Sequence, residues 1–449
     1  MRSASVSLAG ASHTNLAQNP LYIDVFSGAK HIYTAGDIVR GVVRVDPTAR
    51  PQNVSITFKG ISILYDKDFE GCKTEFFRLE QDLFTSSSTS ENYDILRQGT
   101  ADDGKVELPF QFTFPHGVVQ APPEGRQWRY SKDSFGHPRF QHSPGFLLPP
   151  TCTSLTNAWV AVPPGVSYYL EARTDSSLRI RQDVKFVPPA PEYDLRLLQP
   201  NLDFGTDLPK QQCRYKFIRT RKLLPSYQEK SNKFGKMKEF LVEKELFFGS
   251  ETFSEIPFYR FNVLATPPRV IVIGSDFPIH ITLQHLDRSS SIPEPPPLFM
   301  RRVRIQVIST YETFVPQPKN SVNRATEHVD RAEKTTTLID KKFTSSDGEP
   351  LKDGLNLAEF GELRRFETDE LVTPSFSSYG MTLEHELRVD VWGECAKSEW
   401  SGMVCKDKVQ FVSGWTFSHV SEEDMLTGPD QLHARPPPQA FPPPEYSTM

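Results

Sequence analysis

The sequence predicts an all-β protein: two tandem antiparallel β-sandwiches and a disordered, proline-rich C-terminal tail. Apolar and polar residues alternate in many short segments, which is the pattern of half-buried strands. No apolar stripe of helical period runs for three or more turns. The 38 prolines suit strand ends and loops better than long helices. A chain of 449 residues made of short strands requires two such sandwiches.

Two segments carry the strand pattern in the first half of the chain. In 54–60, apolar Val54, Ile56 and Phe58 alternate with polar residues. In 106–114 the alternation is stronger and places five apolar side chains on one face: Val106, Leu108, Phe110, Phe112 and Phe114. Pro109 cannot donate a ladder hydrogen bond, so this strand is expected at a sheet edge or beside a bulge.

Three segments repeat the pattern in the second half. They are 279–283, 303–307 and 387–391, in which Ile, Leu or Val occupies every second position. Turns rich in Pro, Gly and Ser separate these segments, as expected for antiparallel sheets.

Prolines mark the boundary between the two predicted sandwiches, within Val187–Asn201. We therefore divide the chain into a disordered N-terminus (1–19), an N-domain (20–187), a linker (188–209), a C-domain (210–417) and a disordered tail (418–449). Irregular segments within the domains are expected at 121–145 and 319–354.

Composition narrows the class of protein. Hydrophobic residues make up 37%, charged residues 24%, and the net charge of −5 names no partner by itself. No signal-peptide pattern and no apolar stretch of membrane-spanning length is present. No C-x-x-C pair occurs among the five scattered cysteines. We therefore expect them to be small core residues of a protein in the reducing cytosol. They are Cys72, Cys152, Cys213, Cys395 and Cys405.

Several strand sequences resemble the arrestin family. The segment YTAGDIVRGVVRV (33–45) followed by VSITFKG (54–60) resembles the opening of an arrestin N-domain. LPFQFTFP (108–115), LLPPTCTS (147–154) and VSYYLEA (166–172) resemble later N-domain elements, and 374–395 resembles the late C-domain strands. The 121–145 insert and Thr151, where serine is usual, depart from the family pattern. The closest likeness is to the α-arrestins, which implies two immunoglobulin-like sandwiches and an adaptor that couples membrane transporters and receptors to ubiquitin ligases.

The tail carries a short peptide pattern with its own chemistry. Pro443, Pro444 and Tyr446 fit the P-P-x-Y peptide that WW domains bind. Proline runs are already extended as polyproline II, so docking costs little chain entropy, and the tyrosine enters a neighbouring pocket. Composition alone yields this pattern in about one chain in ten of this length. The resemblance to α-arrestins favours its use as a ligase-docking site.

A variant of this pattern occurs at Leu224, Pro225 and Tyr227, in LPSY. If both patterns were exposed, a ligase with several WW domains could bind with avidity. A turn proline followed by a packed tyrosine is the preferred interpretation. Ala190-Pro191-Glu192-Tyr193 lacks the first proline and is discounted.

The segment 210–244 is basic, with eleven Lys or Arg against three Glu. Its densest part comprises Arg214, Lys216, Arg219, Arg221 and Lys222. Such a cluster could bind anionic lipid headgroups or an acidic tail of a membrane cargo protein. A solvated strand-and-loop face is the slightly preferred alternative. Nucleic acid is not expected, because no reader motif accompanies the charge.

No residue pattern predicts catalysis, a metal site or a cofactor. No G-x-S-x-G, H-E-x-x-H or glycine-rich phosphate loop occurs. His280 and His285, in a predicted strand region, lack metal-site spacing, and His137 and His142, in the 121–145 insert, are expected to be loop residues. We therefore expect a non-enzymatic, cytoplasmic adaptor that is recruited to the plasma membrane and endosomes by a HECT-type ligase and cargo tails. The alternatives are a retromer-like structural subunit and a sandwich enzyme.

Overall fold

The computed structural model describes most of the two predicted strand-rich regions. The described residues are 19–28, 31–49, 51–65, 71–85, 104–118, 146–153, 163–175, 177–200, 215–227, 256–315, 328–343, 348–361, 373–378 and 381–414. They are mostly strands, they contain no α-helix, and their helical turns are short 3-10 helices: η1 (Pro47–Ala49), η3 (Leu195–Leu198), η4 (Arg221–Leu223) and η6 (Leu357–Phe360). The predicted all-β class is confirmed. Among these residues there is no helix long and apolar enough to cross a membrane.

The strands of the first half form a three-stranded and a six-stranded sheet, with a small β7–β8 pair beside them. The first sheet has the order β1-β3-β6, and the second has β2-β11-β10-β4-β5 with β9 paired to β10. Their bounds are β1 Leu21–Val25, β2 Ile32–Tyr33, β3 Ile38–Val45, β4 Asn53–Tyr65, β5 Gly71–Thr85, β6 Val106–Thr113, β7 Gly117–Val118, β8 Phe146–Leu147, β9 Cys152–Thr153, β10 Gly165–Thr174 and β11 Arg179–Phe186.

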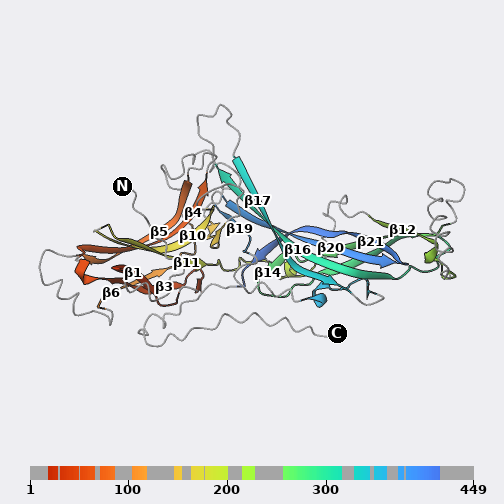
Figure 1. The fold of residues 1–449 in the computed structure, drawn as a ribbon, viewed down its shortest axis with the longest axis horizontal. Coiled ribbons are helices and arrows are strands. Elements are labelled where there is room, and N and C mark those ends of the chain that lie inside the picture. The colour runs from red at the N-terminus through yellow and green to blue at the C-terminus, as the bar shows by residue number, and fades with distance from the viewer. Residues whose placement is uncertain are drawn as a thin grey trace, which may run out of the picture.

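The second half repeats this plan with a three-stranded and a seven-stranded sheet. Their orders are β12-β13-β15 and β14-β21-β20-β16-β17, with β18 paired to β16 and β19 to β20. The bounds are β12 Lys216–Arg219, β13 Phe258–Thr266, β14 Val270–Val272, β15 His280–Arg288, β16 Leu298–Val315, β17 His328–Lys342, β18 Glu349–Pro350, β19 Phe376–Ser378, β20 Met381–Cys395 and β21 Ser398–Val412. Figure 1 shows strands β1–β11 at one end of the long axis and β12–β21 at the other.

Where apolar and polar residues alternate in the sequence, their side chains alternate between the core and the solvent in the structure. Along β6 the burial alternates at every residue, as predicted for 106–113. The same holds in the second half, where Val303, Ile305 and Val307 of β16 have no exposed surface. Strand β6 ends the order of its sheet, so the edge position predicted from Pro109 is confirmed.

Two apolar clusters form the cores. The first joins the facing sheets of the first half, with Phe58, Phe114 and Tyr168 at its centre. The second joins the sheets of the second half around Phe261, Ile305 and Phe411. Met381, at the start of β20, belongs to the first cluster, so the two halves are in contact.

The sequence predicts purely antiparallel sheets, and this prediction is wrong for two strand pairs. Strand β2 pairs with β11 in parallel, and β14 pairs with β21 in parallel. Each parallel pair joins segments more than a hundred residues apart in the chain. Residue alternation reports only which face of a strand is buried, so it cannot reveal the direction of a distant partner.

Candidate functional site

The tail residues Pro443, Pro444 and Tyr446 lie outside the described residues, which end at Gly414. Their proposed role therefore stays a prediction from the sequence. Arg214 of the basic cluster, His137 and His142 also lie outside the described residues.

The LPSY pattern at Leu224–Tyr227 forms a turn. The amide of Tyr227 donates to the carbonyl of Leu224 at 3.0 Å, and Pro225 and Ser226 are exposed at the bend. Proline is favoured at the second position of such a turn because its φ is already fixed. A WW groove binds an extended peptide, so docking here would require this turn to open.

The basic cluster lies on edge strand β12 and the 3-10 helix η4 that follows it. The hydroxyl of Thr220 caps η4 by accepting from the amide of Lys222 at 3.3 Å. Arg221 and Lys222 are half-buried on that turn. Lys216 reaches across to β21, where its Nζ donates to the carbonyl of Ser401 at 2.8 Å. Four of the five predicted basic residues, Lys216, Arg219, Arg221 and Lys222, thus lie on β12 and η4.

Exposed aromatic side chains accompany these charges, and sequence reasoning missed them. Tyr215 is 56% exposed and Phe217 44% exposed, while Ile218, the next residue of β12, packs in the second core. The guanidinium of Arg260 on β13 lies 5.2 Å from the ring centre of Phe217 and 5.6 Å from that of Tyr215. The alternation of Tyr215, Lys216, Phe217 and Ile218 was the available signal, because it places both aromatic rings on one face of a strand.

A buried ionic cluster lies on the face of the six-stranded sheet opposite the first core. Both carboxylate oxygens of Glu171 on β10 are engaged: Arg173 Nε donates to Oε1 at 2.5 Å and Arg179 Nε to Oε2 at 2.6 Å. Lys59 Nζ on β4 lies 3.7 Å from Oε1. The side chain of Glu171 is 2% exposed and that of Lys59 is 7% exposed.

The protonation states follow from this arrangement. For Glu171, burial favours the neutral acid, but the hydrogen bond from Arg179 and the charge of Lys59 outweigh it and hold its pKa below the usual value. Burial lowers the pKa of Lys59, although Glu171 partly opposes that shift. This cluster gave no signal in the sequence, since its members come together only through the register of three strands.

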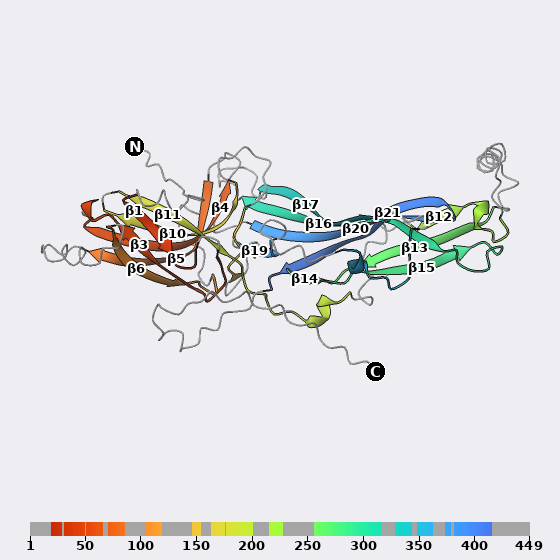
Figure 2. The same ribbon diagram turned by 60° about the horizontal axis from the view of Figure 1, so that its bottom comes forward.

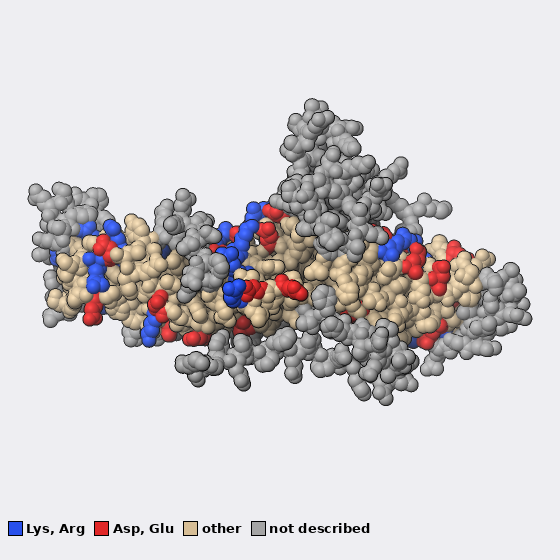
Figure 3. Space-filling view, turned by 180° about the vertical axis from the view of Figure 1, so that it is seen from behind, with Lys and Arg blue, Asp and Glu red and all other residues tan. Residues whose placement is uncertain are grey.

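On the outer face of the seven-stranded sheet, charges of opposite sign are paired. Arg302 binds Asp340 through two hydrogen bonds of 2.7 and 2.6 Å, and Arg304 and Arg388 both contact Asp390. Basic and acidic side chains lie next to one another over the described surface in Figure 3. Such pairs neutralise one another and leave little net charge to attract a partner.

A groove of about 590 Å³ lies where the two halves meet. The linker prolines Pro188, Pro189 and Pro191 line one side, and strands β19, β20 and β21 line the other. The hydroxyl of Ser413 donates to the carbonyl of Pro188 across this junction. The lining is mostly apolar, and the ion pair between Lys408 and Glu384, at 2.7 Å, is exposed at it.

His385 borders the groove as a neutral imidazole. Its Nε2 lies 2.9 Å from the carbonyl oxygen of Thr373, which only accepts, so Nε2 carries the proton. Its Nδ1 then accepts from the hydroxyl of Ser309 at 2.9 Å. Burial lowers the pKa of His385 to about 4.

The described cysteines are unsuited to nucleophilic chemistry. Cys152, Cys395 and Cys405 are buried, and burial raises the pKa of both Cys152 and Cys395 to about 12. A protonated, inaccessible thiol behaves as a small apolar core residue. Within the described ranges, no three His, Cys, Asp or Glu side chains are grouped as a metal ion would require.

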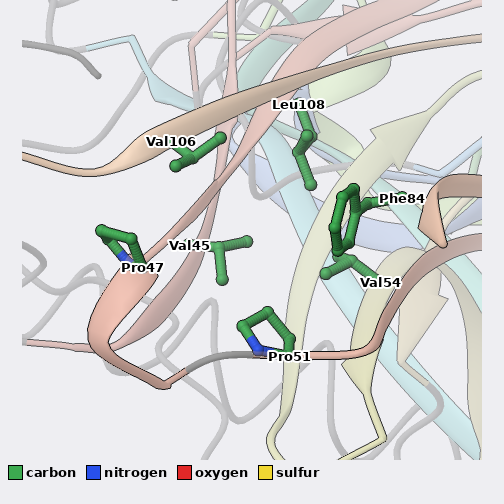
Figure 4. A pocket seen from close by; sticks show the side chains of 7 residues that line it. All are labelled: Val45, Pro47, Pro51, Val54, Phe84, Val106 and Leu108. Carbon is green, nitrogen blue, oxygen red and sulfur yellow. The ribbon is translucent and has the colours of Figure 1, made fainter. Parts of the chain in front are cut away.

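A second cavity, between β3, β4 and β6, is about 10 Å³ in volume. Figure 4 shows its apolar lining, which includes Val45, Phe84 and Leu108. It has room for no more than about one water molecule and offers no polar partner for it. It therefore belongs to the packing of the first core.

Comparisons with known protein families and with curated proteins find no match for this chain.

Proposed function

We propose that this chain is an adaptor that recruits a WW-domain HECT-type ubiquitin ligase to membrane transporters or receptors and promotes their ubiquitin-dependent endocytosis. The observation that carries the proposal is the sequence Pro443-Pro444-Glu445-Tyr446, within the proline-rich segment that follows β21 in the sequence. An all-β body agrees with the α-arrestin resemblance, in which such a peptide docks the ligase.

The proposed fold in detail is a tandem of two arrestin-like, immunoglobulin-like sandwiches at 20–187 and 210–417, followed by a disordered tail. Two separate apolar clusters support this division. The first draws on residues 21–186 together with Met381, and the second on residues 218–411.

In the proposed mechanism the protein performs no covalent step. The proline rings of Pro443 and Pro444 lie between aromatic side chains of a WW domain, and Tyr446 enters the adjacent pocket. Other surfaces of the adaptor bind the cargo, so the ligase and the cargo are held in one complex. This raises the local concentration of cargo lysines around the ligase. Such an adaptor works in the cytoplasm and is recruited to the plasma membrane and endosomes.

Isolated WW domains test this proposal in a pull-down with the full chain. Tyr446→Ala is expected to weaken binding by about ten- to a hundredfold, because it removes one buried aromatic side chain worth about 1.5–3 kcal/mol. Tyr193→Ala is the matched control, since it follows Pro191-Glu192 without the first proline of the motif. Tyr227→Ala is expected to bind as the unaltered protein does, because its motif is closed into a turn. Undiminished binding by Tyr446→Ala would exclude the tail as the docking site.

A further inference from the structure

Exposed apolar side chains are concentrated at one end of the molecule. Six large apolar residues are strongly exposed among the described residues: Phe26, Leu147, Leu195, Tyr215, Phe217 and Leu286. Three of them, Tyr215, Phe217 and Leu286, lie on or directly beside the sheet β12-β13-β15. Figure 2 shows β12, β13 and β15 together at the end of the long axis away from β1–β11.

Strand geometry fixes the direction of these side chains. Phe217 and Arg260 are directly opposite each other in the β12–β13 register, and so are Ile218 and Tyr259. Ile218 and Tyr259 face the second core. Successive residues of a strand point to opposite faces, so Tyr215, Phe217 and Arg260 share the face turned away from that core.

The side chain of Arg260 contacts the aromatic rings of this face, so that they form one continuous patch. Its guanidinium carbon lies within 5.2–5.6 Å of the ring centres of Tyr215, Phe217 and Phe258. The side chain is 44% exposed, and its acidic neighbour Asp287, at 4.0 Å, is 53% exposed. The charge is thus solvated and shared with aromatic faces, so it can still interact with an external anion.

The surrounding chain is strongly basic. The described segments 215–227, 256–262 and 284–294 hold six Lys or Arg and only two acidic residues, Asp287 and Glu294. The six are Lys216, Arg219, Arg221, Lys222, Arg260 and Arg288. The whole chain, in contrast, carries −5. This end therefore attracts an anionic surface, whereas the paired charges on the seven-stranded sheet do not.

We propose that the basic aromatic patch, made of Tyr215, Phe217, Arg260, Arg221 and Lys222, docks on an anionic lipid bilayer. Aromatic side chains are enriched at the headgroup level of a bilayer, where the hydrocarbon core lies on one side and water on the other. Basic residues near an anionic bilayer are attracted by its surface potential. The combination of aromatic and basic side chains in this patch suits that boundary better than either property would alone.

This inference deepens the membrane recruitment in the proposed function and is independent of the tail peptide. It assigns the contact to an aromatic strand face together with its charges, whereas the sequence indicated only the charges. An acidic protein surface is the competing occupant, and lipid vesicles without protein distinguish the two.

The test is co-sedimentation of the full chain with phosphatidylcholine vesicles, with and without phosphatidylserine. Tyr215→Ala with Phe217→Ala is expected to weaken binding to the anionic vesicles about tenfold, the equivalent of roughly 55 Å² of apolar surface. Arg221→Gln with Lys222→Gln is expected to weaken it about thirtyfold and to reduce its salt dependence, since two surface charges are lost.

Phe26→Ala is the matched control, because Phe26 is 65% exposed but directly follows β1, which lies in the other half of the molecule (Figure 1). It should bind vesicles as the unaltered chain does, and Phe217→Trp should bind more tightly. Equal binding to vesicles with and without phosphatidylserine would overturn the proposal, as would full binding by the double aromatic variant. Tyr446→Ala should still bind vesicles, and the aromatic variant should still bind WW domains, so each proposal can fail alone.

Discussion

Replacing Glu171 with glutamine is expected to destabilise the protein by about 3 kcal/mol. In the native state Glu171 is 2% exposed and balances three cations: Arg173, Arg179 and Lys59. Glutamine keeps the shape of the side chain but not its charge. The substitution therefore leaves a nearly buried ammonium, that of Lys59, without its counter-charge.

The magnitude follows from the exposure of each partner. Arg173 and Arg179 are 38% and 46% exposed, so solvent screens both contacts to about 0.5 kcal/mol each. Breaking a buried pair by removing one partner costs about 3–5 kcal/mol. The lower end, about 3 kcal/mol, applies to the whole cluster, because Nζ of Lys59 lies 3.7 Å from the carboxylate. The two arginine contacts account for about 1 kcal/mol of this total and Lys59 for about 2 kcal/mol.

Urea unfolding of the single and double variants measures this effect. Lys59→Met should lower the free energy of unfolding by less than about 1 kcal/mol. Burial already disfavours the ammonium of Lys59, and in this variant Glu171 still binds both Arg173 and Arg179. In the double variant no unpaired buried charge remains, so we expect a coupling of about 2 kcal/mol between the two sites. Glu107→Gln is the control, since its ion pair with Arg44, at 2.9 Å, is half-exposed.

The pH dependence has a definite sign. The folded-state pKa of Glu171 lies below its ordinary value of 4.5, so its contribution is complete above that value. The contribution is lost as the pH falls through the lower, folded-state pKa. The difference in the free energy of unfolding between the unaltered protein and Glu171→Gln should therefore disappear at acidic pH. Losses below about 1 kcal/mol at neutral pH, or strictly additive single losses, would refute the assigned role of this cluster.

Three further outcomes are expected. The pKa of His385 falls from 6.5 unfolded to about 4 folded, so the unfolded state binds the extra proton and stability drops as pH falls through that window. His385→Gln should abolish that loss, about 3 kcal/mol between pH 7 and 4 in urea unfolding, and an unchanged pH profile would contradict it. Gly60→Ala should destabilise by about 1–3 kcal/mol, because its Cβ would meet Phe77 at 2.6 Å and Tyr168 at 2.7 Å; a neutral result in thermal unfolding would mean that these rings move freely. A Tyr446 phosphopeptide should bind WW domains more weakly than the plain peptide in calorimetry, since a dianion does not suit an apolar pocket, and tighter binding would contradict that docking mode.

Local sequence determined several strands and which of their faces is buried. The expectation of an irregular segment over 319–354 was wrong, because β17 (His328–Lys342) lies within it and is held by pairing with β16. The alternation at 106–113 and 303–307 sufficed because a strand places successive side chains on opposite faces whatever its partner is. The edge position of β6 also followed from one local property, the missing amide hydrogen of Pro109. The tail peptide and the basic stretch were visible as residue patterns for the same reason.

The tertiary structure decided what depends on distant partners. Parallel pairing of β2 with β11 and the burial of Glu171 beside Lys59 leave no periodic trace in the sequence. Likewise, Arg260 contacts Phe217 only because β12 and β13 pair in one register, although the two residues lie 43 positions apart in the sequence. A strand's own residues specify its faces, whereas its neighbours are set by the free energy of packing the whole sheet.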